Sequence, residues 1–158
     1  ADRFNSLMLH SCGVIHKGKG YLFVAVSGGG KSTIAKLADR RIVLNDDRML
    51  IRKKGKRFIM CGTPWHGEFK RVSGVSIPIH RLFFLKKANR NYIFPLTNQK
   101  AMVKLLNNVI YLPVNAKTRS KIFKFCSQMI EQLKGYTLGF KPERNIWRFI
   151  DDASRSYS

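Results

Sequence analysis

Acidic residues are scarce in this sequence. Nine Asp and Glu stand against 30 Lys and Arg in 158 residues, which gives a formal net charge of +21. The stretch from Phe69 to Ile130 has no acidic residue and twelve Lys and Arg. A charge of this sign attracts polyanions, namely nucleotides, nucleic acid, acidic proteins or anionic lipid, without distinguishing among them. A drift of composition toward lysine without functional meaning remains an alternative.

Long apolar runs are also absent. No run approaches the roughly 18 to 20 residues that cross a bilayer, and the N-terminus lacks the pattern of a signal peptide. We therefore expect a cytoplasmic protein without a membrane span. The 158 residues, 44% of them hydrophobic, suit one domain with a real core. Since no repeat or linker divides the chain, we expect a single domain over residues 1–158.

Cysteines are few and widely spaced. Cys12, Cys61 and Cys126 form no CxxC pair, so the sequence suggests neither a zinc knuckle nor a disulfide framework. We expect free thiols that are buried or half-buried, because free cysteine usually behaves as a small hydrophobic side chain.

Short apolar segments rich in β-forming residues alternate with helical patterns. We expect strands over residues 7–15, 21–26, 41–45, 49–52, 57–61, 75–85 and 136–140. We expect helices over residues 32–40, 118–133 and 145–150, and a further helix from a Thr97 cap to about Asn107 or Asn108. Gly135 fits the C-cap of the helix over 118–133. The expected fold class is α/β, with a mixed sheet and flanking helices.

A glycine-rich segment, VAVSGGGKST, lies between an expected strand and an expected helix. Glycines let successive backbone N–H groups turn toward phosphates, because they carry no Cβ. In the phosphate-binding pattern GxxxxGK[ST], the lysine contacts the β and γ phosphates and the following hydroxyl ligates Mg²⁺. Lys31 and Ser32 occupy these positions, and Ala25 replaces the first glycine. The segment therefore predicts a P-loop for ATP with Mg²⁺, which its residues would bind: Ser27, Gly28, Gly29, Gly30, Lys31, Ser32 and Thr33.

Two adjacent carboxylates follow the next expected strand, in IVLNDD. In P-loop proteins an acidic residue at the end of a neighbouring strand holds Mg²⁺. In extended chain the side chains of Asp46 and Asp47 point to opposite faces, so the two can take different roles. The alternative is that they serve only a turn or a helix cap.

The segments LHSCGVIHKGKGYLFVAVSGGGKSTIAKL and RIVLNDDRMLI resemble the catalytic domain of HPr kinase/phosphorylase and of HPr-kinase-like serine kinases. The resemblance implies a P-loop core shared with ATP-dependent phosphoenolpyruvate carboxykinase. It also implies that Asp46 is the general base, that Asp47 holds Mg²⁺ with Ser32, and that His10 lies near the phosphates or orients the base. Departures at Ala25 and Thr33 and the missing acidic-Arg-Gly signature put phosphorylase activity in doubt.

The remaining candidates lie outside these motifs. The loop from Gly62 to Ser73 carries four polar residues that could close on an acceptor, His66, Glu68, Lys70 and Arg71, with Trp65 as a pocket cover or a core residue. Solvated loop side chains are the simpler reading, and we expect His16 and His80 to be structural.

Three functions remain open. The first is a kinase in which Lys31, Asp46 and His10 transfer the γ-phosphoryl of ATP to a serine-type hydroxyl of a protein, peptide or amino acid. The second is a nucleic-acid-binding module, although no RNA- or DNA-binding signature is present. The third is a nucleotide-binding domain without transfer activity. Expected partners are the nucleotide, that acceptor and weakly bound polyanions, and a homo-oligomer is left open.

Overall fold

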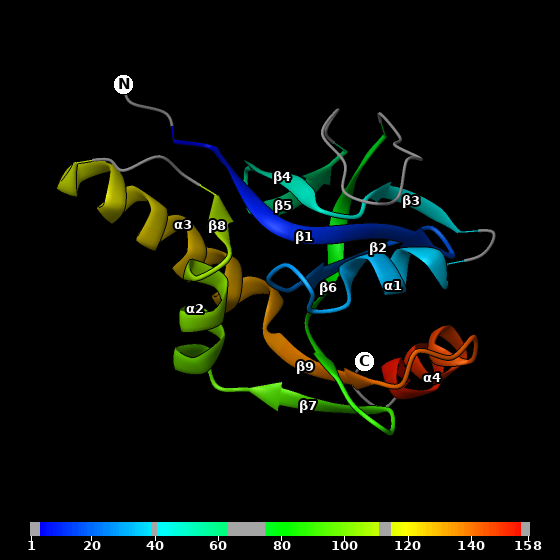
Figure 1. Ribbon diagram of the computed structural model, residues 1–158. Helices are drawn as coiled ribbons and strands as arrows, with labels where there is room; N and C mark the ends of the chain where they lie inside the picture. Colours follow the sequence, from blue (N-terminus) through cyan, green and yellow to red (C-terminus); the bar gives the residue numbers. More distant parts are fainter. Residues whose placement is uncertain (1–3, 39–40, 63–74, 111–114, 156–158) are drawn as a thin grey trace.

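The computed structural model describes residues 4–38, 41–62, 75–110 and 115–155. It is an α/β fold built on a mixed sheet of nine strands with flanking helices (Figure 1). The strands are β1 (Ser6–His16), β2 (Lys19–Val24), β3 (Ile42–Asn45), β4 (Arg48–Lys54), β5 (Arg57–Cys61), β6 (Ser76–Lys87), β7 (Tyr92–Leu96), β8 (Val109–Ile110) and β9 (Gly135–Phe140). The helices are α1 (Lys31–Lys36), α2 (Asn98–Leu106), α3 (Ala116–Leu133) and α4 (Ile146–Ser154). The coarse fold class expected from the sequence is therefore confirmed.

The long strands β1 and β6 each pair with several other strands of the sheet. The strand order is β2-β1-β4-β5-β6-β9-β7, β3 and β8 both pair with β1, and β2 also pairs with β6. The first half of β1 pairs with β4 and its second half with β2. The pairs β2–β6 and β6–β9 are parallel, whereas the neighbours of β1 run antiparallel to it. Since β2 bonds both β1 and β6, the strands β1, β4, β5, β6 and β2 close into a ring.

The core lies on both faces of the sheet because alternate residues of a strand point to opposite faces. In β2, Leu22 and Val24 belong to one hydrophobic cluster and Tyr21 and Phe23 to the other. Helices α2 and α3 supply side chains to the first cluster, while α1 and α4 supply the second. The side chains of α1 thus anchor the segment that follows the glycine-rich loop.

Several expected elements differ at their ends. The helix expected over residues 32–40 is α1, which begins at Lys31 and ends at Lys36. Strands β7 and β8 were not predicted. The predicted Thr97 cap of α2 is confirmed, since the Thr97 hydroxyl accepts a hydrogen bond from the Lys100 backbone at 3.2 Å. None of the helices in the described ranges is long and apolar enough to cross a membrane.

The prediction that Gly135 caps α3 is wrong. The left-handed residue at the end of that helix is Lys134, with φ 61°, and Gly135 is the first residue of β9. A Cβ on Gly135 would lie 2.9 Å from the Ala101 Cβ and 3.0 Å from the Phe84 ring. The glycine therefore allows close packing of β9 against α2 and β6. The loop candidates Trp65, His66, Glu68, Lys70 and Arg71 lie outside the described residues.

Candidate functional site

The loop between β2 and α1 needs its glycines. Gly28 and Gly30 have positive φ angles of 81° and 111°, which side chains other than glycine rarely adopt. A Cβ on Gly29 would lie 2.6 Å from the Ala25 Cβ, and one on Gly30 would lie 2.6 Å from the Phe140 ring. The chain can therefore make this turn only with small residues, and the expected strand–loop–helix order is confirmed.

Ala25 fits the turn despite its methyl group. Its side chain is buried, its backbone N–H donates to the His10 carbonyl at 3.4 Å, and its own carbonyl accepts a hydrogen bond from the Lys31 ammonium. This contact ties the two ends of the loop together. The departure from glycine at this position does not prevent tight turning.

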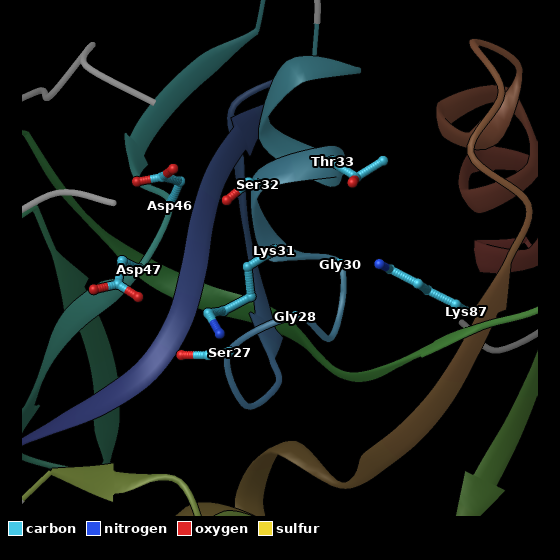
Figure 2. A pocket seen from close by; sticks show the side chains of 9 residues that line it. All are labelled: Ser27, Gly28, Gly30, Lys31, Ser32, Thr33, Asp46, Asp47 and Lys87. Atoms are coloured by element: carbon cyan, nitrogen blue, oxygen red, sulfur yellow. The ribbon is translucent and has the colours of Figure 1, made fainter. Parts of the chain in front are cut away.

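A pocket of about 410 Å³ opens beside the loop (Figure 2). Lys31 and the Asp46–Asp47 pair, which are 15 residues apart in sequence, reach it from different elements. It is lined by Ser27, Gly28, Gly30, Lys31, Ser32, Thr33, Asp46, Asp47 and Lys87. The structure therefore brings together nearly all of the predicted loop residues and both predicted carboxylates, whereas Gly29 and His10 are not among the lining residues.

Lys31 is the buried cation of the pocket, with 5% of its surface exposed. Burial lowers the pKa of its ammonium because the charged form loses hydration, while the carboxylates of Asp47 and Asp46 act in the opposite direction. An ammonium has three protons to donate, and among the described residues that of Lys31 donates to the Ala25 carbonyl. The geometry leaves room for an anionic acceptor on the pocket side.

Asp46 and Asp47 lie in the bend between β3 and β4. Asp46 is 1% exposed, whereas the Asp47 side chain is 27% exposed and its Oδ2 lies 3.2 Å from the Arg48 Nε. The Asn45 side chain shapes the bend, since its Oδ1 accepts from the backbone N–H groups of Asp47 at 2.8 Å and Arg48 at 3.0 Å. The expectation of opposite faces assumed extended chain, whereas both residues lie in the bend, line one pocket and differ in exposure.

His10 lies on β1 opposite Arg48 of β4. Burial lowers the pKa of its imidazole, Lys31 and Arg48 lower it further, and Asp47 raises it. Its buried Nδ1 has no hydrogen-bond partner among the described residues. His10 is thus near enough for the charges of Lys31 and Asp47 to act on its pKa, but it does not line the pocket.

Lys87 was missed by the sequence analysis. It ends β6 and extends toward Gly30 from the side of the loop opposite the two aspartates (Figure 2). Because β6 is parallel to β2, the carboxyl ends of both strands reach the same edge of the sheet. The signal in the sequence was the Lys86-Lys87 pair at the end of a predicted strand.

The described residues hold no group of three or more His, Cys, Asp or Glu side chains that could bind a metal ion by themselves. The pocket does supply oxygen donors, from two carboxylates and the hydroxyls of Ser32 and Thr33. Mg²⁺ typically takes one or two carboxylates and completes its shell with phosphate oxygens and water. These oxygens could therefore hold Mg²⁺ only if a bound phosphate supplied further ligands.

Comparison with known protein families identifies the family of this chain. The family model for the SynChlorMet cassette protein ScmC matches residues 1–154. The chain belongs to this family. No curated protein matches it.

Membership of the ScmC family corrects the identification as an HPr-kinase-like P-loop serine kinase, which was wrong, and the enzyme assignment with it. The resemblance covered nearly the whole chain but was strong only through residue 50, where a glycine loop and an aspartate pair carry it. Motifs this short can arise wherever a strand must turn tightly beside acidic residues. The roles of Asp46 as a general base and of His10 as a catalytic residue came from this resemblance alone, as did the serine-type acceptor. They are therefore withdrawn with it. The strand order does not confirm a phosphoenolpyruvate-carboxykinase-like core.

Proposed function

We propose that the protein binds the phosphate groups of a nucleotide, with Mg²⁺, in the pocket beside the glycine-rich loop. The observation that carries this proposal is Lys31, a lysine 5% exposed whose side chain lines an open pocket. A buried ammonium is costly unless an anion or hydrogen-bond acceptors compensate it. We assign the protein a binding role and no transfer reaction.

Two further features support a phosphate ligand. Lys87 supplies a second positive charge from the other side of the loop, and a backbone of small residues lets a ligand approach the loop closely. Helix α1 has six residues, so its dipole contributes little. The two lysines and the loop backbone are the proposed anion contacts.

Asp46 and Asp47 support the magnesium part of the proposal. They lie in the same pocket as the lysines, where carboxylates alone would repel a phosphate. A divalent cation between the carboxylates and the phosphates would remove that repulsion. The residues that would hold it are Asp46, Asp47 and Ser32. The cytoplasmic location, the single domain over residues 1–158 and a homo-oligomer stay predictions.

Calorimetric titration tests the proposal. We expect wild type to bind Mg-ATP, and Lys31→Met to weaken binding about tenfold or more, since a hydrogen bond to a charged group contributes about 1.5–3 kcal/mol. The matched control is Lys100→Met on the exposed surface of α2, which removes the same charge and should bind as wild type does. Chelating Mg²⁺ should weaken binding to wild type.

Two results would overturn the proposal. One is the absence of heat for wild type at millimolar Mg-ATP. The other is an equal loss in Lys31→Met and Lys100→Met, which would show that total charge and not the pocket attracts the nucleotide.

A further inference from the structure

A second cationic hollow lies away from the loop pocket, between α3 and the hairpin of β4 and β5. It consists of two adjoining hollows of about 390 Å³ and 350 Å³, which share Lys53 and Gln128. We call it the α3 groove and define it by the side chains of Lys53, Lys56, Lys121, Lys124 and Gln128. Within the described part of the chain, it shares no lining residue with the loop pocket.

Packing fixes the shape of the α3 groove. The Lys53 ammonium donates to the Gln128 Oε1 at 2.8 Å, which joins β4 to α3. Beneath this contact the Phe58 and Phe125 rings meet edge to face, with centroids 5.4 Å apart. Phe4 packs against Phe125 in the same manner at 6.0 Å. The hollow is therefore formed by packed aromatic rings, and Lys53, Lys121 and Lys124 line it.

The charge of the groove has one sign over most of its length. Lys117, Lys121 and Lys124 are spaced i, i+4, i+7 along α3, which places them on one helix face. Among the described lining residues, Glu131 is the one carboxylate, and it lies in the second hollow with Lys56. Lysines that line one hollow raise its positive potential, and a polyanion bound there is attracted by it and releases counterions.

We propose that the α3 groove binds single-stranded nucleic acid. Successive lysines on a helix rise by about 4.5–6 Å at 1.5 Å per residue, so Lys121 and Lys124 can each face a phosphate along one strand. Phe4, half-buried, lines the same hollow and offers a ring on which a base can stack. A cationic groove with an aromatic side chain beside it is the usual arrangement for single-strand binding. An acidic peptide would use the lysines but not the ring.

Fluorescence anisotropy with a short labelled oligo(dT) tests the proposal over a salt series. The groove variant is Lys121→Gln with Lys124→Gln, and the matched control is Lys100→Gln with Lys104→Gln on the exposed face of α2. Both remove two positive charges. We expect the groove variant to bind about tenfold or more weakly and to lower the salt slope by about 1.4, at roughly 0.7 per lost phosphate contact. The control should lose far less.

Equal losses in the two variants would overturn the proposal in favour of diffuse charge. Tighter competition by poly-glutamate than by unlabelled oligo(dT) would overturn the choice of partner. Phe4→Leu keeps the apolar packing and should weaken oligo(dT) binding about fivefold or more while leaving binding of inorganic polyphosphate unchanged; an equal effect on both would exclude stacking.

Thermal melts establish that each variant is folded. If the double variant is not folded, the single variant Lys124→Gln at an exposed position replaces it. Lys31→Met should bind oligo(dT) as wild type does, which separates this proposal from that for the loop pocket.

Discussion

His16 shows how one side chain can join three segments of the chain. Its Nδ1 lies 2.7 Å from the Arg41 Nε, and its Nε2 lies 2.8 Å from the Asp151 Oδ1. Because arginine can only donate, Nδ1 accepts and Nε2 carries the proton that Asp151 accepts. The Arg41 guanidinium also stacks over the Trp147 ring at 4.7 Å. The structural role expected for His16 is that of a neutral link between β1, the start of β3 and α4.

The stability of the protein should fall as His16 takes up a proton. Burial lowers the pKa of His16 below its ordinary 6.5, its hydrogen bond to Asp151 raises it, and Arg41 and Lys17 lower it. Since the unfolded state binds the proton more readily, the contribution of His16 is complete above about pH 6.5 and shrinks as the pH falls below it. Thermal midpoints measured from about pH 7.5 to pH 5.5 should therefore decline.

The variant His16→Gln isolates this effect. A glutamine amide can donate to Asp151 and accept from Arg41, and it does not titrate. Burial also lowers the pKa values of His10 and His80. Wild type and His16→Gln both contain these two histidines, so their effect on the pH dependence is the same in the two proteins. The wild-type midpoint should fall more steeply than that of His16→Gln; parallel curves would assign the decline to the other histidines.

At the scale of the element, the glycine-rich loop is constrained unequally along its length. Gly28 and Gly30 both have positive φ, yet a Cβ would meet nothing within 4 Å at Gly28 and the Phe140 ring at 2.6 Å at Gly30. Gly30 is therefore fixed by packing as well as by backbone conformation. This contact with β9 holds the beginning of α1 and, with it, Lys31.

Gly30→Ala should destabilise the protein more than Gly28→Ala. Alanine with positive φ costs about 1–2 kcal/mol, which applies to both variants, and the collision with Phe140 adds about 1–3 kcal/mol more for Gly30→Ala. Denaturant unfolding measures both, with Gly28→Ala as the control for the conformational term. Equal losses would show that Phe140 moves aside without cost.

Sequence reasoning predicted every element of the described residues except β7 and β8, and the long or strongly apolar ones gave the clearest patterns. Helix α3 and strands β1, β2 and β6 are long or strongly apolar, so their patterns stand out. Strand β7 is short, contains Pro95 and pairs in the described structure with β9 alone, as suits an edge strand. The Tyr92 ring covers Gly139 across that pair, and a Cβ there would lie 2.1 Å from it. Such a contact depends on the register of two distant segments, which local patterns do not contain.

At the scale of the whole molecule, the candidate site was predicted in part. The loop and the aspartate pair are local motifs, and the structure places them in one pocket. Lys87 joins them only because β6 runs parallel to β2 at that edge, and parallel pairing between distant strands leaves no local signal. The family could not be derived from the motifs either, because a few residues that suit a tight turn can occur in unrelated families.

The net charge should govern how the stability of the whole molecule responds to salt. With 30 basic and nine acidic residues, repulsion among the lysines and arginines opposes the compact state. Asp47, Asp151 and Glu143 lie within 3.2 Å of a basic partner, but nine acidic residues can offset only part of the charge of 30 basic ones.

We therefore expect the thermal midpoint to rise with ionic strength. The Debye length falls from about 30 Å at 0.01 M salt to about 10 Å at 0.1 M, which screens repulsion across the molecule while leaving the close ion pairs nearly intact. Most of the rise should occur by about 0.15 M, and each kcal/mol should appear as roughly 2–4 °C for a chain of this size. Sodium chloride and potassium chloride should act alike, because the effect is screening and not ion binding.

A midpoint that falls with salt would mean that attractive pairs dominate. A rise confined to phosphate salts would point instead to anion binding at the lysines of the loop pocket or the α3 groove, and the variants Lys31→Met and Lys121→Gln with Lys124→Gln would tell the two sites apart.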